Sequence, residues 1–572
     1  MDRHAAARLL DTIATHLELK GENPFKVRAF GNAARAVETF PGDLDEALAS
    51  GALAEAEGIG KATVEVLREF ARTGRSTLLD GLRREVPPGL VEMRRIGGLG
   101  AAKIRVLHEQ LRITTIAELE LAARNGRLAG VPGFGGKTAE RIVRGIAFLN
   151  RTSGFRLSHH AAQAAEQLRA VIAAIPGVGR VEVAGSVRRR AEVVRDVDLA
   201  VAAAIPADEL GARLREAAPS LEVTAGEGAL ALRAGDGFPA DVYCAGAEQF
   251  GHTLAWATGS AAHLEALAAR AAARGLDLDR GGLRRGGDPL PCPDEAALYL
   301  ALGLPVIPPE LREEGEEVAR AAAGTLPRLV ERGDLRGLLH CHSRYSDGTS
   351  SIADLAAAAR AAGYGYLGLT DHSAAAAYAG GMKPDAVLRQ HAEIDALNRD
   401  LDGFRVLKGV EADILADGSL DYTSDILDTF DFAVGSVHSR MEQDAATMTQ
   451  RVLRAMDDPH LTILGHPTGR LLLGRDPYAL DVDAVMARAA ERGVAIEING
   501  DPQRLDLDWR RCRQARDAGA TLSIGSDAHS LAGLGNMESG LAVARKGGLE
   551  SKDVLNTMDP DGFLAFARRR RG

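Results

Sequence analysis

The sequence predicts a multi-domain protein with an all-α N-terminal part, an α+β middle part and a C-terminal β/α barrel. In residues 1–150, apolar residues recur every three or four positions, which is typical of amphipathic helices. Residues 151–325 instead combine alternating strand patterns, such as VEVAGS and DVDLAVA, with Ala-rich helical segments. From about Leu335 onwards, short apolar segments alternate with helical ones, as in a β/α barrel.

Composition limits the class of protein. The chain has 572 residues, of which 46% are hydrophobic and 26% charged, so it can form several cores and is neither disordered nor fibrous. Charged residues interrupt the longer apolar stretches before the roughly 18 residues that a membrane span needs, and the first residues lack the apolar segment of a signal peptide. The cysteines lie far apart without a C-x-x-C motif, so we expect a reduced, cytoplasmic setting. They are Cys244, Cys292, Cys341 and Cys512.

The formal net charge of −10 at first argues against a nucleic-acid partner. Counted by segment, residues 1–150 carry 22 basic and 19 acidic side chains. Residues 151–330 carry 19 and 24, and residues 331–572 carry 28 and 36. The N-terminal quarter is therefore mildly basic. The excess of carboxylates further along the chain can reflect bound metal cations or only a soluble surface.

The N-terminal part repeats one local pattern three times, a helical segment followed by a Gly-x-Gly turn and a second helical segment. Glycine lets the turn bring backbone N–H groups close to an anion at the N-terminus of the second helix. One such turn would more often only connect two helices, but three within 150 residues favour binding of the DNA backbone. The repeat resembles the helix–hairpin–helix motif. The glycines are Gly58 and Gly60, Gly98 and Gly100, and Gly133 and Gly135.

Two lysines lie near the first of these turns in the sequence, and we expect Lys26 and Lys61 to contact phosphates. A fourth Gly-x-Gly at residues 177–179 precedes the strand pattern RVEVAGS instead of a helix. It is therefore predicted to be an ordinary turn.

The middle part carries a pair of aspartates on one predicted strand. Asp196 and Asp198 are two positions apart, so they project to the same face and can hold one hard cation between them. Asp241, on a later strand, would complete a two-metal site for phosphoryl transfer. Ser186 and Arg189 would offer donors to a polyphosphate. Taken alone, the Asp-x-Asp pair could also be the polar face of an edge strand.

The arrangement G-S…D-x-D…D, which begins at Gly185, resembles the palm of the nucleotidyltransferase superfamily. Together with the helical repeats, residues 1–325 resemble a family X DNA polymerase. Further matching strings are ENPFKVRAFGNAARAVE, the TGS at Thr258–Ser260 and PPELRE. The resemblance implies that Asp196, Asp198 and Asp241 are catalytic and bind two Mg²⁺ or Mn²⁺ ions, with Asp241 assisting deprotonation of the primer 3′-hydroxyl. It implies that the incoming nucleotide is bound by Gly185, Ser186, Arg189, Trp256, Gly259 and Ser260.

Four positions depart from the family pattern. Trp256-Ala257 replaces the usual Tyr-Phe that discriminates the sugar, and Leu264 replaces an Asn that contacts the base. Arg195 stands in place of a small Gly before the first aspartate. Val66 occupies the position of the Schiff-base lysine, so a lyase that uses this position is excluded.

The C-terminal part places histidines and carboxylates at nearly every predicted strand end, where barrel active sites form. Such ligands suit Zn²⁺, Mn²⁺ or Fe²⁺. The pattern resembles the PHP domain (polymerase and histidinol phosphatase), a distorted β/α barrel that holds up to three metal ions and hydrolyses phosphoesters. The resemblance implies nine ligands, with Glu411 bridging two ions. These are His340, His342, Asp347, His372, Glu411, His438, His466, Asp527 and His529.

Three further residues of this part lie between predicted ligands in the sequence. Arg470 and Arg504 are candidate phosphate binders, with ion pairing as the alternative. Cys341 lies between two of the ligands, but strand alternation points its side chain away from them, so we expect it to pack in the core.

These resemblances predict five domains. They are a lyase-like helix–hairpin–helix domain (1–85), a second helix–hairpin–helix DNA-binding domain (86–152), a palm (153–245), a nucleotide-selection subdomain with linker (246–325) and a PHP domain (335–570).

Three functions remain open at this point. The first is a family X polymerase that fills gaps in DNA repair, with a Mn²⁺-dependent 3′-5′ exonuclease or 3′-phosphodiesterase in the barrel. The second is a metal-dependent 3′ exonuclease with a DNA-binding arm and an impaired polymerase site, suggested by Arg195, Ala257 and Leu264. The third is a non-catalytic DNA-binding scaffold, which the complete ligand sets disfavour. We expect gapped or primer-template DNA and dNTPs as partners, no membrane, and a cytoplasmic, nucleoid-associated monomer.

Overall fold

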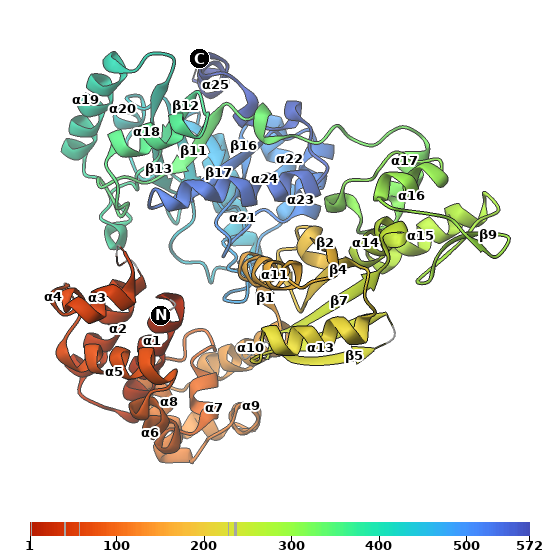
Figure 1. Cartoon of the computed structure of the whole chain (residues 1–572). Helices are drawn as coiled ribbons and strands as arrows, with labels where there is room; N and C mark the ends of the chain where they lie inside the picture. Colours follow the sequence, from red (N-terminus) through yellow and green to blue (C-terminus); the bar gives the residue numbers. More distant parts are fainter. Residues whose placement is uncertain are drawn as a thin grey trace. The chain divides into compact units, whose positions relative to one another are not determined.

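A computed structural model describes residues 1–572 apart from residues 2, 39, 41, 57, 227, 234–236 and 572 and the side chain of residue 4. The chain divides into two compact units, Met1–Ser153 and Gly154–Gly572 (Figure 1). None of the helices in the described part of the chain is long and apolar enough to cross a membrane.

The first unit is all-helical, as predicted. Its helices form one apolar core around Leu10, Phe30 and Leu67 and another around Ile104 and Ile142. The helices are α1 (Arg3–Lys20), α2 (Pro24–Glu38), α3 (Leu44–Ser50), α4 (Ala52–Glu55), α5 (Lys61–Thr73), α6 (Thr77–Glu85), α7 (Pro88–Met93), α8 (Ala101–Leu111), α9 (Ile116–Arg124), the 3-10 helix η1 (Arg127–Gly130) and α10 (Gly136–Thr152).

The three Gly-x-Gly turns of this unit share one backbone geometry. The first glycine of each turn is left-handed, with φ of 86° at Gly58, 77° at Gly98 and 84° at Gly133. L-residues with a Cβ rarely adopt this conformation. The second glycine of each turn is the N-cap of α5, α8 or α10 and offers no side chain to the helix end. The backbone N–H groups at these helix N-termini therefore receive no cap from the N-cap side chain.

The second unit begins with a mixed sheet in the order β2-β4-β7-β6-β5, in which β4 and β7 run parallel and the other neighbours are antiparallel. The turn at Gly177 leads directly into β2, as predicted. The strands are β2 (Val178–Val183), β4 (Val197–Ala203), β5 (Glu222–Gly226), β6 (Ala229–Arg233) and β7 (Pro239–Ala245), with the short pair β1 (Arg156–Leu157) and β3 (Val193–Val194) beside them. The helices are α11 (Ser158–Ala173), α12 (Gly185–Arg188) and α13 (Ala207–Ala217).

Alternate residues of β4 face opposite sides of this sheet. Leu199 packs in the core that α11 and α13 cover, whereas Ala200 packs against Phe250 of α14 (Phe250–Thr258). Asp198 shares the parity of Ala200 and faces the same side as α14. The aspartates therefore lie on the face opposite the larger core.

The segment after the mixed sheet forms a small subdomain around Leu267, Leu283 and Tyr299. Among the described residues it contains a three-stranded antiparallel sheet in the order β10-β9-β8. Its elements are η2 (Ala247–Gln249), α14, α15 (Ala261–Ala272), β8 (Asp277–Asp279), β9 (Gly282–Arg285), β10 (Asp288–Pro289), α16 (Glu295–Ala301), η3 (Pro309–Leu311) and α17 (Glu316–Ala322).

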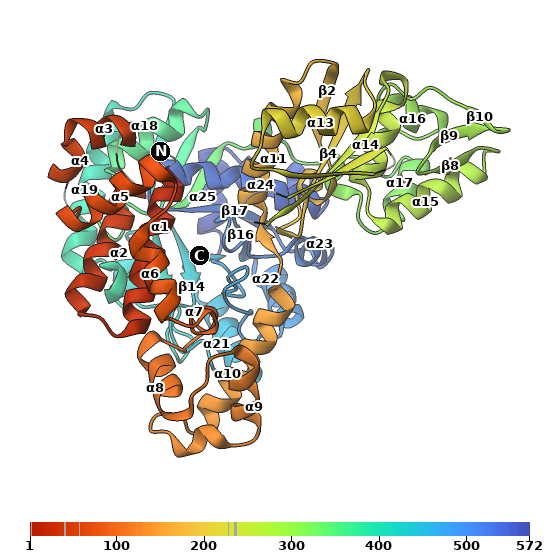
Figure 2. The same cartoon turned by 60° about the horizontal axis from the view of Figure 1, so that its bottom comes forward.

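The C-terminal part is a closed barrel, as the alternating pattern predicted. Within the described residues seven parallel strands follow one another around it, and β17 pairs with β11 to close the ring. Figures 1 and 2 show its helices outside the strands. The strands are β11 (Gly337–Cys341), β12 (Tyr366–Leu369), β13 (Arg405–Asp413), β14 (Phe432–Ser436), β15 (Leu461–Leu464), β16 (Ala495–Asn499) and β17 (Leu522–Ala528).

Helices connect and follow these strands. They are η4 (Arg332–Asp334), α18 (Ile352–Ala361), η5 (Ala377–Ala379), α19 (Pro384–Asp400), α20 (Ser424–Leu427), α21 (Ala445–Asp457), α22 (Val482–Arg492), α23 (Trp509–Asp517), η6 (Ala532–Gly535), α24 (Asn536–Lys546), η7 (Ser551–Asp553), η8 (Leu555–Thr557) and α25 (Pro560–Arg568).

The fully buried Asn556 reinforces the closure of the barrel. The register of β11 against β17 shifts after Leu339, so this seam has an irregular ladder. The Asn556 amide donates to the carbonyls of Gly337 (3.1 Å) and Ile524 (2.8 Å), and its oxygen accepts from the Ile524 N–H (2.7 Å). One side chain therefore satisfies three buried backbone groups at the closing seam.

We expect Asn556→Leu to lower the free energy of unfolding by about 2–4 kcal/mol, because leucine fills the space and leaves these backbone groups unpaired. Denaturant unfolding of the full chain measures the change. The matched control is Asp561→Ala, whose side chain is 90% exposed and whose loss should change stability by less than about 0.5 kcal/mol. Equal stability of Asn556→Leu and the wild type would contradict the bridging role.

Candidate active sites

The three predicted aspartates of the mixed sheet meet at one end of two parallel strands. Asp198 on β4 and Asp241 on β7 are register partners on neighbouring strands. Asp196 precedes β4 and shares the parity of Asp198. Burial, followed by the like charges of Asp196 and Asp241, raises the pKa of Asp198 to about 7. Burial and the charge of Asp196 also raise the pKa of Asp241. The cluster therefore favours any ligand that brings positive charge.

A cavity of about 380 Å³ adjoins this cluster. It brings together most of the predicted nucleotide-binding residues with two that the sequence analysis did not identify, Tyr243 and Arg280. The lining residues are Gly185, Ser186, Arg189, Asp196, Asp198, Tyr243, Trp256, Ala257, Gly259, Leu264 and Arg280.

The glycine and serine of this cavity are locally determined. Gly185 has φ of 61°, and a Cβ at this position would lie 1.7 Å from the Asp198 Oδ2 atom. Another residue would therefore displace the carboxylate. The buried Ser186 hydroxyl has no hydrogen-bond partner among the described residues. An unsatisfied donor of this kind fits an anionic ligand.

Two predicted nucleotide-binding residues, Arg189 and Ser260, make contacts within the protein. Arg189 lines the cavity, while its guanidinium donates to the Thr258 carbonyl (2.7 Å) and pairs with Glu313 (3.0 Å). Ser260 caps α15, and its hydroxyl donates to the Glu313 carbonyl (2.7 Å). Ser260 is not among the cavity-lining residues, so its side chain contacts Glu313 and does not line the cavity.

Two departures from the family pattern can be placed. The exposed Arg195 guanidinium lies over the Phe155 ring, 4.3 Å from its centroid. Val66 is 7% exposed and packs in the first helical core. Of the two predicted phosphate contacts nearby, Lys61 is exposed at the start of α5, and the Lys26 ammonium lies 3.4 Å from Glu22.

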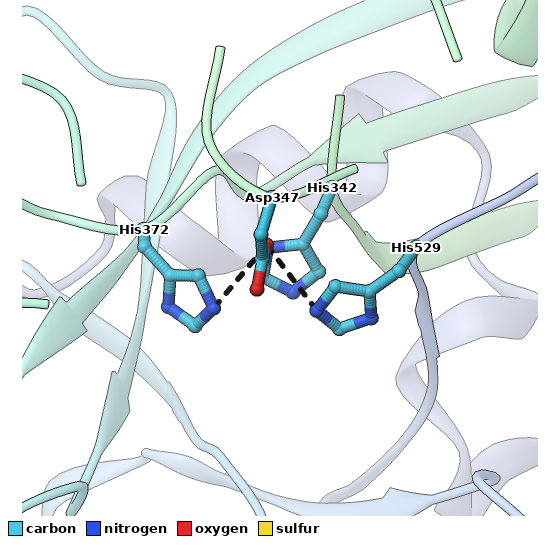
Figure 3. Close-up of side chains that lie close together, drawn as sticks. All are labelled: His342, Asp347, His372 and His529. Atoms are coloured by element: carbon cyan, nitrogen blue, oxygen red, sulfur yellow. Dashed lines mark ion pairs between the residues drawn. The ribbon is translucent and has the colours of Figure 1, made fainter. Parts of the chain in front are cut away.

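All nine predicted ligands of the barrel converge at the C-terminal ends of its strands. Three overlapping groups have ligand atoms within 4.8 Å of one another in the described part of the chain. Figure 3 shows one of these groups, with the Asp347 carboxylate between the rings of His372 and His529 and the His342 ring beside it. The groups are His342, Asp347, His372 and His529; His340, His342 and Asp527; and His372, Glu411 and His438.

The buried Glu411 lies at the centre of this arrangement. Its two oxygens approach ring nitrogens on different sides, with 2.8 Å to His372 and 3.0 Å to His466. Among the described residues, five imidazoles lie within 3.7 Å of this carboxylate. They are His340, His342, His372, His438 and His466.

The site holds more buried polar atoms than its own hydrogen bonds satisfy. Both ring nitrogens of His342 and the Nε2 atom of His340 are buried without a hydrogen-bond partner among the described residues. Burial opposes protonation of His438, yet Glu411 and Asp413 raise its pKa to about 10. These features fit metal ions, which would bind the free nitrogens and replace the protons.

Three of the predicted ligands have backbone conformations that residues other than glycine rarely adopt. His340, His466 and Asp527 have positive φ values of 61°, 21° and 48°. Among the described residues the same holds for five non-glycine residues that are not predicted ligands, Arg112, Arg190, Arg440, Leu473 and Leu505. Such conformations persist where the surrounding structure enforces them.

Several family models and relatives match this chain. Family models match residues 1–76 (helix-hairpin-helix domain), 91–147 (SAM-like helix-hairpin-helix tandem), 253–313 (DNA polymerase beta thumb) and 339–500 (PHP domain). The chain is 36% identical to the DNA polymerase/3′-5′ exonuclease PolX of Bacillus subtilis (strain 168), over 100% of both chains.

The chain belongs to the family X DNA polymerases with a fused C-terminal PHP domain.

A second group of relatives matches only part of this polymerase. A probable phosphatase of Shewanella sediminis is 30% identical over 39% of the chain and 88% of its own length. Another, from Thermoanaerobacter sp. (strain X514), is 29% identical over 36% of the chain and 84% of its own length. The matched lengths are similar to that of the PHP barrel.

Two carboxylates of the PHP barrel orient its ligands and were not identified from the sequence. Glu497 on β16 accepts from His340 Nδ1 at 2.5 Å and from the His466 backbone N–H at 2.6 Å. Asp413 lies 2.7 Å from His438 Nδ1. Such contacts fix the ring orientation and the protonated nitrogen. Asp413 could have been found, because it lies two positions after Glu411 on one strand face. Glu497 could also have been noticed, because a charged residue inside an apolar strand is unusual.

Of the two candidate phosphate-binding arginines of the PHP barrel, one lies at the site and the other forms an ion pair away from it. Arg504 stays at the site, with its Nε atom 3.3 Å from the Asp527 carboxylate. Arg470 instead pairs with Glu192 of the palm at 2.6 Å and donates to the Arg504 carbonyl at 3.0 Å. The buried Cys341 lies in the barrel core with its sulfur 3.2 Å from the Ser526 hydroxyl, as expected for packing.

The raised pKa of Asp198 predicts a pH-dependent cost to folding in the metal-free protein. Because the folded-state pKa of about 7 exceeds the unfolded value, stability present below about pH 4 is lost as the pH rises through 7. We expect Asp198→Asn to be about 2 kcal/mol more stable than the wild type at pH 8 and equal to it at pH 4. Unfolding in a chelator measures this, with the exposed Asp288→Asn as control. A gain at both pH values would contradict the assignment.

Proposed function

We propose that this chain fills short gaps in DNA during repair and removes 3′-terminal nucleotides or 3′-blocking groups at its PHP barrel. The observation that carries the proposal is the presence of two separate acidic clusters in one chain. One is a carboxylate triad beside a 380 Å³ cavity. The other is a buried ring of imidazoles and carboxylates. The Bacillus subtilis relative, whose name carries both activities, matches the whole chain.

In the polymerase reaction, residues of the cavity wall bind the nucleotide, and a carboxylate of the mixed sheet accepts the proton. The unsatisfied Ser186 hydroxyl, with Arg280 and Arg189, holds the triphosphate of a dNTP. Asp241 accepts the proton of the primer 3′-hydroxyl, for which its raised pKa suits it. Asp196, Asp198 and Asp241 would hold the divalent ions, Mg²⁺ or Mn²⁺, and such ions would supply charge neutralisation for the phosphoryl group.

For the nuclease reaction, the nine predicted ligands would hold up to three Mn²⁺, Zn²⁺ or Fe²⁺ ions, and such ions would supply Lewis acidity. Glu497 and Asp413 keep His340 and His438 in the orientation that binding requires. Arg504, beside Asp527, offers a cation to the scissile phosphate.

The partners follow from these roles. We propose gapped or primer-template DNA, gripped through the three Gly-x-Gly turns, with Lys26 and Lys61 as phosphate contacts, and dNTPs as the second substrate. We propose that the protein acts as a monomer in the cytoplasm, at the nucleoid.

A second candidate is a nuclease with an impaired polymerase site. The observation that favours it is that Ala257 and Leu264 line the cavity, where the family usually has larger or polar side chains. The ribose contact and base contact of the incoming nucleotide would both be weakened.

One experiment separates these functions. A labelled primer in a gapped duplex is incubated with Mn²⁺, with and without dNTPs, and with the variants Asp198→Ala and His342→Ala. We expect extension to fall at least about a hundredfold only in Asp198→Ala, and shortening to fall as much only in His342→Ala. Extension that is absent in the wild type with both Mg²⁺ and Mn²⁺ would support the impaired-polymerase alternative instead.

Tyr378 provides a separate test of the nuclease substrate. Its side chain is 73% exposed, and its ring centroid lies 6.3 Å from those of both His372 and His438. An aromatic ring at this place can stack on the terminal base, an interaction worth about 1–3 kcal/mol. We therefore expect Tyr378→Ala to raise KM for a DNA 3′ end about tenfold. Hydrolysis of a small aryl phosphodiester should change less than about twofold, since it has no base to stack.

The control for this prediction is Tyr378→Phe, which keeps the ring and removes the hydroxyl. It should behave as the wild type does. Equal losses on DNA and on the small diester would instead indicate that Tyr378 supports the ligands themselves.

A further inference from the structure

A lysine of the PHP barrel is buried against the polymerase part of the same unit. Lys546 is the last residue of α24 and is 1% exposed. Residues of α24 and of the palm helix α11 line a common cavity. Burial of an ammonium group costs several kcal/mol unless it is paired and hydrogen-bonded. A lysine is therefore retained here for the contacts it makes.

The ion pair and the hydrogen bond of Lys546 lie on the polymerase side, while its ammonium also lies 5.1 Å from the centroid of the Trp509 ring in the barrel. The Lys546 ammonium forms an ion pair with the Glu313 carboxylate and donates a hydrogen bond to the Arg189 carbonyl at 2.9 Å. Glu313 lies just after η3, and Arg189 directly follows α12. The barrel thus holds two segments of the polymerase that are distant in sequence.

One of these segments lines the nucleotide cavity, and the other is bonded to residues of its wall. Arg189 lines the cavity, pairs with Glu313 at 3.0 Å and donates to the Thr258 carbonyl at 2.7 Å. The Ser260 hydroxyl donates to the Glu313 carbonyl at 2.7 Å. Gly259, between Thr258 and Ser260, also lines the cavity. Arg189 and the Thr258–Ser260 turn are consequently fixed to one another through Glu313.

Glu313 depends on both of its cations. It is partly buried between Lys546 and Arg189, and although burial opposes ionisation, the two cations together lower its pKa. Without the lysine, the Arg189 carbonyl and one side of the Glu313 carboxylate would lose their donor in a region largely closed to water. The guanidinium and the turn would then be free to shift from the cavity.

We propose that Lys546 is a positioning residue for the polymerase reaction, through which the PHP barrel fixes the nucleotide-binding wall of the palm. The inference rests on the proposed polymerase function. It assigns to the barrel a role in dNTP binding that is separate from its predicted metal ligands, because the ionic and hydrogen-bonding partners of Lys546 are Glu313 and Arg189.

The test is single-nucleotide insertion by the full chain on a gapped duplex. In Lys546→Met we expect KM for the dNTP to rise about tenfold, which corresponds to the loss of one charged hydrogen bond, while kcat changes less than about twofold. Shortening of the same primer without dNTPs should equal that of the wild type. Lys546→Arg keeps a cation and should recover most of the affinity.

The neighbouring arginine supplies a matched control. Arg545 also bridges the barrel to the segment around η3, with 2.7 Å to Glu310 and 3.1 Å to the Val330 carbonyl. Glu310 is not among the residues that line the nucleotide cavity. Arg545→Met should therefore leave KM for the dNTP within about twofold of the wild type.

Three results would overturn the proposal. They are an unchanged KM in Lys546→Met, an equal rise of KM in Arg545→Met, and a loss of primer shortening that matches the loss of insertion. Absence of insertion by the wild type would overturn the polymerase function itself, and this inference with it. An active wild type with unchanged KM in Lys546→Met would overturn the inference alone.

Discussion

The buried carboxylate of Glu411 is the group on which the arrangement of the barrel depends. The ionised Glu411 carboxylate is only 1% exposed, so its negative charge must be compensated by positive charge nearby. The barrel provides the compensating partners by ending neighbouring parallel strands at one face, so that imidazoles from several strands reach the same carboxylate. His340 and Asp527 have positive φ values at these strand ends, a conformation that the surrounding structure must enforce.

The palm meets the same electrostatic problem with fewer groups. Asp198 and Asp241 stand opposite each other on parallel strands, and Asp196 joins them from the same face. No imidazole is among the residues that line the adjoining cavity, and its cationic side chains, Arg189 and Arg280, leave the pKa of Asp198 raised. A cationic ligand would therefore be favoured there. A Cβ at Gly185 would lie 1.7 Å from the Asp198 Oδ2 atom, so a larger residue would displace this carboxylate. Both sites therefore store unfavourable charge that ligand binding relieves.

Ion pairs between the palm and the barrel were beyond the reach of sequence patterns. Arg470 was a reasonable phosphate-binding candidate, since it lies in a loop after a ligand, yet its guanidinium pairs with Glu192 of another domain. Lys546 gave no signal at all, because a lysine at the end of an amphipathic helix is ordinarily solvated. Glu497 was overlooked, although a charged residue within an apolar strand is itself unusual. The partners Glu192 of Arg470, Glu313 of Lys546 and His340 of Glu497 each lie more than a hundred residues away in the chain.

Local and periodic features were determined by the sequence itself. The helix–turn–helix repeats, the seven strand segments of the barrel, the two-residue spacing of Asp196 and Asp198 and the ligands at strand ends all follow from backbone periodicity and glycine chemistry. Only the tertiary structure decided which of these side chains share a site, which buried carboxylates orient them, and that a barrel lysine contacts the nucleotide cavity. Those choices depend on burial and on charges brought together from distant segments. Because Coulomb energies rise steeply in a desolvated interior, such pairs are selected by the folded environment and leave no periodic trace in the chain.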